Sequence, residues 1–572
     1  MKRIFCLLLA LLTVGAVLVG CGNTSPDAST DVDSDSVSTV TEDGDESQTT
    51  DGGGAEEEDI KVLYNGIELP DVWPPNDVEG VVGGSSGEIP YLISRADGGI
   101  RPDVIDISVG RQLFVDDFLI ESTTLSSTYH KATPYSDSPI VVPDTQSDGN
   151  ACLLSSGGVW YDESEKLFKM WYMASWTNGV AYATSTDGIN WQKPLVGMGN
   201  NIVNKHLPPD STTVWLNQYA TDESERYVMF VRTADTKYSN YQQGQYYYNG
   251  YIYTSPNGIN WTLKTQTGVC GDRSTIFYNP FLDKWCFSIR SYINHEGKAT
   301  HRARKLYMSS ALENFKNSWS TAVNWLFADS NDKTNEYFNV AEIYCVDAVA
   351  YESIMLSVVE ILEGPDNTQS VSLGIPKVTE LTLAYSRDGF HFDRRNKDIF
   401  IEASQTAGEW DQGYLSPAGG VCVTVGDELY FYYSGWQASE TTAYAKSQIG
   451  LAKLRRDGFV SMDGTGELLT RSLEVEDGRK YLFVNVKGSV KAEILDADGN
   501  VYEGFSADDC VGFTGDSTCT MLSWKNGKDL SFLEGKEFKI RFYTEDAELY
   551  SFWLSDTEDG ESHGYHAAGL VE

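Results

Sequence analysis

The chain has 572 residues, and its 83 acidic against 43 basic side chains give a formal net charge of −40. One hydrophobic core stops growing at roughly 250–300 residues, so the length excludes a single domain and predicts two folded domains with additional non-globular sequence. Such an acidic chain repels phosphate backbones, which argues against a nucleic-acid partner. Aromatic residues make up 12% of the chain, which favours strands because aromatic side chains fit a pleated, half-buried surface.

The chain begins with the pattern of a secreted bacterial lipoprotein. Lys2 and Arg3 precede an apolar run, and the stretch LVGC that ends at Cys21 is similar to a lipobox. Residues 1–21 are therefore predicted to be a lipoprotein signal peptide, with Cys21 as the lipidated first residue of the mature protein. An ordinary signal peptide with a chance cysteine is the alternative. The expected location is extracytoplasmic, anchored to the cell membrane by lipid.

Residues 22–60 are an acidic segment of low complexity. They contain 13 Asp and Glu residues, no Lys or Arg, and almost no large apolar residue. Such a composition cannot bury enough apolar surface to order, so we expect a disordered linker that holds the folded domains away from the membrane. Residues 61–104 form an N-terminal extension before the first repeat.

Cysteine pairing is an open question outside the cytoplasm. Beyond Cys6 and Cys21 the chain has seven cysteines, an odd number, so at least one stays free. Cys270 with Cys286, and Cys510 with Cys519, are close enough in sequence to be candidate disulfides. No cysteine or histidine spacing resembles a zinc site.

A short pattern recurs five times along the middle of the chain. It reads YATSTDGINW, YIYTSPNGINW, LYMSSALENF, LAYSRDGFHF and LAKLRRDGFV, and the copies end at Trp191, Trp261, Phe315, Phe392 and Val460. Asp-Gly and Asn-Gly between apolar runs mark hairpins, because these residues tolerate positive φ. Two further strand patterns precede each copy, so each unit is expected to have four short strands.

Four-stranded units repeated every 54–77 residues predict a five-bladed β-propeller over residues 105–465. We expect the recurring aromatic residue to pack between neighbouring blades, and Trp160 and Trp171 to lie in the core. The alternative is a sialidase propeller, whose Asp box reads S-x-D-x-G-x-x-W. Here Gly188 follows Asp187 directly, and five blades are counted where a sialidase has six.

Residues 466–572 lack the repeat. The stretches KYLFVNVKGSVKAEILD and KEFKIRFYTEDAELYSFWLSD read as alternating strands. They predict a β-sandwich accessory domain. The expected fold class is therefore all-β, a five-bladed β-propeller followed by a C-terminal β-sandwich.

Carboxylates stand at the expected start of the first strand in every repeat. They are Asp148, Asp210, Asp272, Glu342, and Glu409 with Asp411. The first strands of a propeller begin near the central axis, so these side chains should converge on one funnel, where mutual repulsion raises some pKa values and leaves other groups ionised. Glycoside hydrolysis needs that division between a protonated acid and a carboxylate base or nucleophile. Single members could instead cap turns or bind a structural cation.

Four motifs, GRQLFVDDFLIEST, GDRSTIFYNP, VDAVAYES and GGVCVTVGDELYFYYSG, resemble secreted bacterial proteins of the glycoside hydrolase superfamily of families 32 and 43. The resemblance spans roughly residues 105–560. It implies an Asp base or nucleophile, a second Asp that orients, and a Glu acid, each on a different blade. Asp272 in GDRS is similar to the second Asp, although invertases have Arg-Asp-Pro there, and Glu342 on the next blade matches the acid.

The first Asp of that set has two candidates. Asp148 heads the first blade, as in the family, whereas Asp210 heads the blade just before Asp272. The sequence SDGN stands where invertases have NDPN. The predicted catalytic residues are Asp148, Asp272 and Glu342, with Asp210 as the alternative base.

Other side chains are candidates for contacts with a sugar. Arginines can bind hydroxyl groups or keep carboxylates ionised, and indole rings can stack on sugars, although ion pairs between blades would use the same arginines. The loop Tyr241–Gly250, with Tyr246, Tyr247 and Tyr248, is expected to rim the pocket. The predicted substrate-binding residues are His130, Asp210, Arg273, Arg290, Arg304, Glu409, Asp411, Trp176 and Trp436.

These patterns predict an extracellular, lipid-anchored glycoside hydrolase that cleaves oligo- or polysaccharides by carboxylate acid–base catalysis. The alternatives are a non-catalytic glycan-binding lipoprotein and a structural or protein-binding propeller. No cofactor is expected to be required, although a structural cation could lie in the propeller channel. The expected partners are a carbohydrate and, through Cys21, the membrane; sugar, linkage, stereochemistry and oligomeric state are left open.

Overall fold

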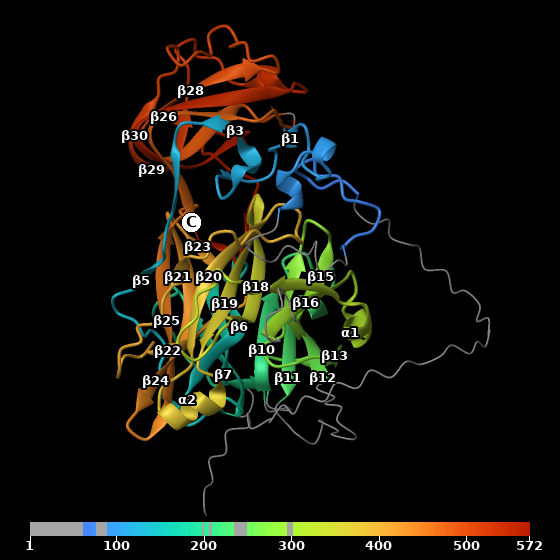
Figure 1. The fold of residues 1–572 in the computed structure, drawn as a ribbon, viewed down its shortest axis with the longest axis vertical. Coiled ribbons are helices and arrows are strands. Elements are labelled where there is room, and N and C mark those ends of the chain that lie inside the picture. Colours follow the sequence, from blue (N-terminus) through green and yellow to red (C-terminus); the bar gives the residue numbers. More distant parts are fainter. Residues whose placement is uncertain are drawn as a thin grey trace, which may run out of the picture. The chain divides into compact units, whose positions relative to one another are not determined.

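The computed structural model describes residues 61–75, 88–196, 199–204, 209–233, 249–293, 301–476 and 478–571 (Figure 1). The predicted signal peptide, Cys21, the acidic linker and the loop tyrosines Tyr246, Tyr247 and Tyr248 lie outside these residues. None of the described helices is both long and apolar enough to cross a membrane.

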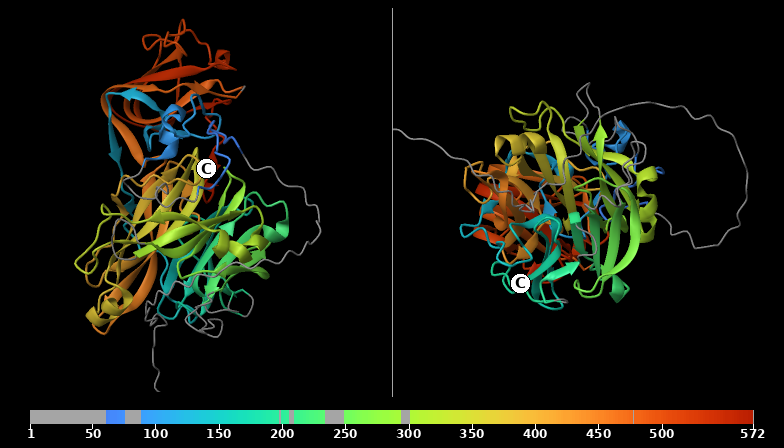
Figure 2. Two further views of the ribbon diagram at one scale, coloured as in Figure 1. Left: turned by 45° about the vertical axis from the view of Figure 1, so that its right-hand side comes forward. Right: turned by 90° about the horizontal axis from the view of Figure 1, so that it is seen from below.

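Five antiparallel sheets, the blades, form the propeller around one axis (Figure 2). The first strand of each blade is its inner strand, the one nearest this axis. Blade one has β6 (Cys152–Asp162), β7 (Leu167–Ala174), β8 (Gly179–Ser185) and β9 (Ile202–Asn204). Blade two has β10 (Pro209–Leu216), β11 (Tyr227–Thr233), β12 (Asn249–Ser255) and β13 (Thr262–Val269). Blade three has β14 (Thr275–Asn279), β15 (Lys284–Ile293), β16 (His301–Ser309) and β17 (Val323–Phe327).

The last two blades have four strands each, besides the strands from the two ends of the chain that are described below. Blade four has β18 (Glu342–Glu352), β19 (Ile354–Gly364), β20 (Val378–Ser386) and β21 (Ile399–Ile401). Blade five has β22 (Gly413–Pro417), β23 (Val423–Val425), β24 (Glu428–Ser439) and β25 (Thr442–Arg455). The described α-helices are α1 (Ser318–Thr321) and α2 (Asn367–Leu373), the latter between β19 and β20. The prediction of a five-bladed propeller is confirmed.

The repeated sequence forms one local structure in blades one, two and four. In blade one the Ser185 hydroxyl accepts the Gly188 N–H, and the Asp187 carboxylate accepts the N–H groups of Ile189 and Asn190 at 2.9 and 2.7 Å. The same bonds recur around Ser255 and Asn257, and around Ser386 and Asp388. A hydroxyl and a carboxyl or amide oxygen, two residues apart, thus satisfy the turn's N–H groups.

These turns also join the blades. The carbonyl of Gly188 accepts a hydrogen bond from Tyr432 of blade five, and that of Gly258 accepts one from Trp171 of blade one. Trp191 packs edge-on against Tyr432 at 5.8 Å between ring centroids, and Phe392 packs edge-on against Trp325 of blade three. At both places the recurring aromatic residue packs between blades, as expected.

Asp187→Ala is expected to lower the free energy of unfolding by about 1 kcal/mol, because two backbone N–H groups lose their acceptor. Chemical denaturation followed by tryptophan fluorescence would measure the loss. Asp498→Ala, at an exposed aspartate in a turn of the C-terminal sheet, is the control and should shift the midpoint little. Equal shifts for the two variants would contradict a structural role for the repeated turn.

The N-terminal segment closes the ring. Its strand β5 (Thr133–Pro134) pairs with β25 on the outer edge of blade five, and the chain then continues along that blade through the bridges Val141–Ile449 and Ala151–Ser447 into β6. The first and last blades are therefore held by one continuous segment.

The C-terminal segment ties three blades at the opposite ends of the inner strands. β31 (Tyr565–His566) pairs with the end of β18, and β32 (Leu570–Val571) runs parallel to β23. Ala567 donates to Ala350 of blade four, Ala568 donates to Cys422 of blade five, and Tyr161 of blade one donates to Ala568.

The remaining strands make a nine-stranded sheet. Its long members are β26 (Val460–Thr470), β28 (Tyr481–Asp496), β29 (Phe513–Leu522) and β30 (Phe538–Ser555), joined by β27 (Leu473–Glu474). The N-terminal strands β1 (Ile105–Asp106), β2 (Gln112–Leu113), β3 (Ile120–Thr123) and β4 (Ser126–Tyr129) also belong to this sheet. The sequence assigned residues 105–129 and 460–465 to the propeller; their strands pair with the C-terminal sheet instead, because neighbours distant in sequence decide which edge a short strand joins.

None of the seven cysteines among the described residues forms a disulfide, so neither candidate pair is joined. Cys286 is buried within β15 and Cys270 accepts a hydrogen bond from Thr267. Cys510 is buried beside Ala492, whereas Cys519 is exposed near Asp559. Closeness in sequence does not make these thiols face one another.

Candidate functional site

The starts of the inner strands define one end of the propeller axis, which we call the mouth. Asp210 lies at the start of β10, Asp272 shortly before β14, and Glu342 at the start of β18. Three carboxylates from blades two, three and four therefore stand at this end, as the sequence predicted. The side chain of Glu342 is 19% exposed and that of Asp272 is 12% exposed, so both remain accessible from the mouth.

Each of these carboxylates has a basic partner. Arg232 of β11 forms an ion pair with Asp210, and Arg290 of β15 forms one with Asp272. Arg302 of β16 lies between Glu342 and Asp272, with an N–O distance of 3.2 Å to Glu342 and of 3.8 Å to Asp272. Arg302 is therefore shared between Glu342 and Asp272.

An aromatic wall, formed by Trp176, Tyr414, Trp436 and Tyr444, borders the carboxylates. The ring of Trp176 lies 6.2 Å from those of Tyr414 and Trp436, and Trp436 packs edge-on against Tyr444 at 5.4 Å. The indole N–H of Trp176 donates to Asp210 at 3.2 Å. The indole N–H of Trp436 is buried and meets no acceptor among the described residues.

Backbone strain gathers around the same place. Trp176 and Tyr414 have φ values of 60° and 51°, and Arg273, Ser155 and Ser156 also have positive φ. Bulky residues in the left-handed region are uncommon, and such strain concentrates at functional sites. The fold therefore holds two residues of the aromatic wall in conformations that they would not adopt freely.

Arg273 lies on the propeller axis and connects several blades. Its guanidinium contacts Ser155 of blade one, Glu360 of blade four and Ser416 of blade five. Its backbone N–H donates to the Ser211 hydroxyl of blade two at 2.9 Å. The residue is 2% exposed. Arg304, also fully buried, donates to the Arg273 carbonyl at 2.8 Å. The structure thus places both arginines within the channel as part of the scaffold, where the sequence predicted substrate contacts.

Asp148 lies apart from the carboxylates of the mouth. It is fully buried and accepts hydrogen bonds from Tyr172, Thr145 and Lys193, at 2.8, 2.7 and 2.8 Å. Burial alone would raise the pKa of Asp148, but these hydrogen bonds outweigh it and lower the pKa below its usual value. The carboxylate fixes the loop before β6 to Tyr172 of β7 and to Lys193 in the loop after β8, so the geometry favours Asp210 as the partner of Asp272 and Glu342.

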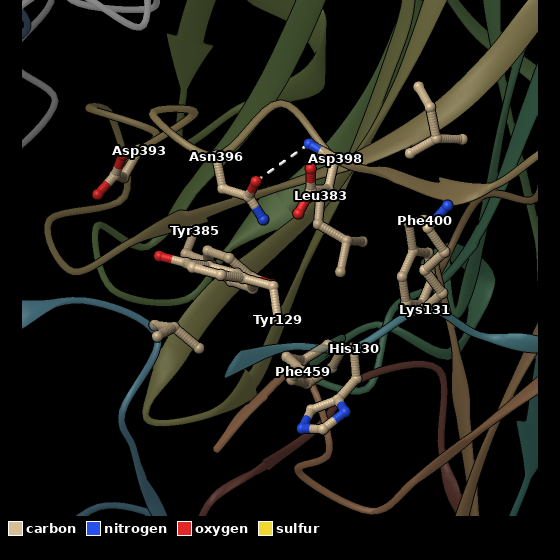
Figure 3. A pocket seen from close by; sticks show the side chains of 12 residues that line it. Tyr129, His130, Lys131, Leu383, Tyr385, Asp393, Asn396, Asp398, Phe400 and Phe459 are labelled. Carbon is tan, nitrogen blue, oxygen red and sulfur yellow. Dashed lines mark hydrogen bonds between the residues drawn. The ribbon is translucent and has the colours of Figure 1, made fainter. Parts of the chain in front are cut away.

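His130 lies outside the mouth, in a small pocket between the N-terminal segment and blade four (Figure 3). Its imidazole is 2.7 Å from the Ser461 hydroxyl and packs against Tyr550, both in the nine-stranded sheet. The pocket has a volume of about 50 Å³ and includes Asp393, Asn396 and Asp398 in its lining. The prediction that His130 enters the funnel is wrong, because the segment 126–134 follows the outer edges of two sheets.

Glu409 and Asp411 lie in the loop before β22. Glu409 is exposed in a turn closed by its N–H and the Thr406 carbonyl. Asp411 packs beside Gly435, and burial raises its pKa, opposed by a hydrogen bond with Ser404. The contacts described for both residues are therefore within blade five. Trp160 and Trp171 are buried in the core, as expected.

Six residues of the mouth were not predicted: Arg232, Arg302, Tyr344, Lys377, Tyr414 and Tyr444. Arg302 stands two residues before Arg304 in HRARKLYMSS, so the two side chains share one face of β16 and only their depth along the axis separates them. The ring of Tyr344 follows Glu342 at the same two-residue spacing on β18. The alternation of side chains along a strand could be predicted from the sequence. The depth of each residue along the propeller axis could not.

Asp347 gives the propeller a pH dependence. It is fully buried in β18, where burial raises its pKa to about 7 although hydrogen bonding from Ser156 and the charge of Arg273 lower it. The folded protein therefore keeps this proton up to about pH 7, whereas the unfolded chain releases it near pH 3.8. The stabilisation is complete below about pH 4 and is lost as the pH rises through 7.

We expect Asp347 to lower the free energy of unfolding by roughly 2–4 kcal/mol between pH 4 and 8, and Asp347→Asn to remove this part of the pH dependence. Melting temperatures at pH 5, 6, 7 and 8 would show it. Burial and the neighbouring Glu380 raise the pKa of Glu363 to about 8, which adds a slope of the same sign to both proteins. Identical slopes for wild type and variant would contradict the role of Asp347.

No protein-family model matches the sequence, and no curated protein is similar to it. One similar solved structure is described as showing that the GH130 family of mannoside phosphorylases contains glycoside hydrolases. It is 14% identical to this chain, the match covers 60% of this chain and 96% of the other, and the TM-score is 0.37. A GH32 β-fructofuranosidase of Bombyx mori is 11% identical, with 78% and 95% covered and a TM-score of 0.36. A fructofuranosidase of Schwanniomyces occidentalis is 10% identical, with 76% and 98% covered and a TM-score of 0.32. At these identities the likeness concerns the fold alone.

The described residues contain no cluster of three or more His, Cys, Asp or Glu side chains arranged to hold a metal ion. The acidic groups of the mouth are paired with arginines instead. The chemistry available there is that of carboxylates, guanidinium groups and aromatic rings.

Proposed function

We propose that this protein is a glycoside hydrolase, lipid-anchored through Cys21 outside the cytoplasm. The observation that carries the proposal is the convergence of Asp210, Asp272 and Glu342 from three blades beside an aromatic wall. Carboxylates next to aromatic planes suit a sugar, which offers hydroxyl groups at its edge and C–H groups on its faces.

The contacts suggest a role for each carboxylate. Asp210, paired with Arg232 and hydrogen-bonded to Trp176, is the proposed base or nucleophile. Glu342 has the most exposed side chain of the three and is the proposed acid. Asp272 lies between Arg290 and Arg302 and orients Arg302 toward Glu342. Removal of one acid–base group costs typically 10²–10⁴-fold in rate.

A second candidate is a glycan-binding lipoprotein without catalysis. The observation that favours it is that each of the three carboxylates forms an ion pair with an arginine of the protein itself. In that case the aromatic wall would hold a glycan that is not cleaved.

The test is a hydrolysis screen of residues 61–572 on aryl α-L-arabinofuranosides, β-D-xylosides, β-D-fructofuranosides, β-D-galactosides and β-D-mannosides. Each assay is run with and without inorganic phosphate, because one similar structure concerns a family of phosphorylases. Glu342→Gln should lose turnover, and Glu402→Gln, at an exposed glutamate outside the mouth, should retain it. Glycan binding without turnover, unchanged in Glu342→Gln, would support the binding protein instead.

A further inference from the structure

An exposed tyrosine stands at the mouth, apart from the aromatic wall. Tyr292, near the end of β15, is 46% exposed, and the guanidinium of Arg290 lies 5.6 Å from its ring centroid. Tyr292 also stands directly opposite Arg302 in the pairing of β15 with β16, and residues opposite each other in an antiparallel pair have neighbouring side chains. Arg290 and Arg302 are the partners of Asp272 and Glu342. The ring therefore lies beside the ion pairs of two of the three carboxylates.

The exposure of Tyr292 sets it apart from other rings of the mouth. Tyr344, Tyr414 and Trp436 are buried and pack in the apolar cluster below the wall. The ring of Tyr292 keeps nearly half of its surface in water although burying an aromatic ring is favourable. Its apolar face is thus available to a ligand that binds at the mouth.

Blade three lies across the ring of blades from the aromatic wall. The wall consists of residues of blades one and five, which adjoin each other. In a ring of five blades, only blade three adjoins neither of them. The carboxylates stand on the inner strands of blades two, three and four, whereas β15 is the second strand of blade three. The carboxylates therefore lie between the wall on one side and Tyr292 on the other.

The proposed roles of the carboxylates give this arrangement a direction. In glycoside hydrolysis the acid donates its proton to the glycosidic oxygen, which leaves with the next sugar, and the second carboxylate acts at the anomeric carbon. Glu342, the proposed acid, is paired with Arg302, the cross-strand neighbour of Tyr292. Asp210, the proposed base or nucleophile, accepts a hydrogen bond from Trp176 of the wall. The leaving sugar then lies toward Tyr292, and the sugar that is attacked lies toward the wall.

We propose, building on the proposed function, that Tyr292 is the binding surface for the leaving sugar, so that the mouth holds at least two linked sugar residues. The C–H face of the leaving sugar packs on the exposed ring, and the Arg290 guanidinium beside the ring is a donor for its hydroxyl groups. Tyr292 thereby selects oligosaccharides over glycosides that have a single sugar residue.

The test compares the binding of one sugar residue with that of two. Calorimetry uses residues 61–572 with Glu342→Gln, which keeps glycosides intact. A methyl glycoside is measured against the disaccharide of the same sugar, for arabinofuranose, xylose, fructofuranose, galactose and mannose. For the sugar that binds, we expect the disaccharide to bind roughly tenfold more tightly, which is the scale of one good aromatic contact.

Replacing Tyr292 tests whether its ring is the cause. Tyr292→Ala should remove the advantage of the disaccharide and leave the affinity for the methyl glycoside unchanged, whereas Tyr292→Phe, which keeps the ring, should retain the advantage. Tyr219→Ala is the matched control, since Tyr219 is also 46% exposed but follows the end of β10 that is opposite to the mouth. Equal binding of methyl glycoside and disaccharide would overturn the inference, and so would an equal loss in the two alanine variants.

Turnover by the wild-type protein separates this inference from the proposed hydrolase. Turnover of aryl glycosides without a preference for disaccharides would leave the hydrolase standing and overturn the role of Tyr292. A preference that depends on Tyr292, without turnover of any glycoside, would keep the ring as part of a glycan-binding site while the proposed hydrolase fails. Binding of none of these sugars would contradict both.

Discussion

Arg273→Met is expected to lower the free energy of unfolding by about 3–5 kcal/mol, the usual cost of breaking a buried ion pair. The substitution leaves Glu360, which is fully buried, without the guanidinium that pairs with it. It also removes hydrogen bonds to Ser155 and Ser416. Because these partners belong to blades one, four and five, the loss should loosen the ring as a whole.

The double variant Arg273→Met/Glu360→Gln is the control. Removing both charges avoids an unpaired buried carboxylate, so it should recover much of the lost stability. Denaturant unfolding, followed by tryptophan fluorescence and by circular dichroism, would measure all three proteins. If Arg273→Met alone were as stable as the wild type, Arg273 would not stabilise the propeller by connecting its blades.

Asp210→Asn is expected to reduce turnover of the folded protein by about 10²–10⁴-fold, with a loss of stability as well, because Asp210 is buried and paired with Arg232. Turnover falls because Asp210 stands at the mouth beside Trp176, and an amide can neither accept a proton nor attack a sugar. Steady-state kinetics on whichever substrate the screen identifies would measure the loss.

Asp148→Asn should lower stability but leave turnover unchanged. Its carboxylate accepts hydrogen bonds from Lys193, Thr145 and Tyr172, and an amide there leaves the Lys193 ammonium, 10% exposed in its side chain, with a weaker partner. The expected loss is about 1–3 kcal/mol of stability, with the turnover of the folded protein retained. Inactivation by Asp148→Asn together with retained activity in Asp210→Asn would instead make Asp148 the base.

The local structure of the repeats follows from short stretches of sequence. The pattern of Ser185, Asp187 and Gly188 satisfies its own turn, so the copies in blades one, two and four can be read without knowing their neighbours. The number of blades, the buried tryptophans and the carboxylates at the starts of the inner strands could be predicted for the same reason.

The sequence could not assign roles among similar residues. Asp148 and Asp210 both precede an inner strand, but only the tertiary structure brings Lys193 to the first and Trp176 to the second. Arg302 and Arg304 share one face of β16, and their depth along the axis separates the group at the mouth from the buried one.

By itself, the sequence determined the all-β class, the five repeated blades and the positions of Asp210, Asp272 and Glu342 at the starts of their blades, since these depend on patterns within a few tens of residues. Only the tertiary structure decided which strands close the ring, that residues 105–129 join the C-terminal sheet, and which carboxylates meet at the mouth. Those outcomes depend on contacts between residues up to several hundred positions apart. Short strands and single charged side chains carry no signal of their own that names such distant partners.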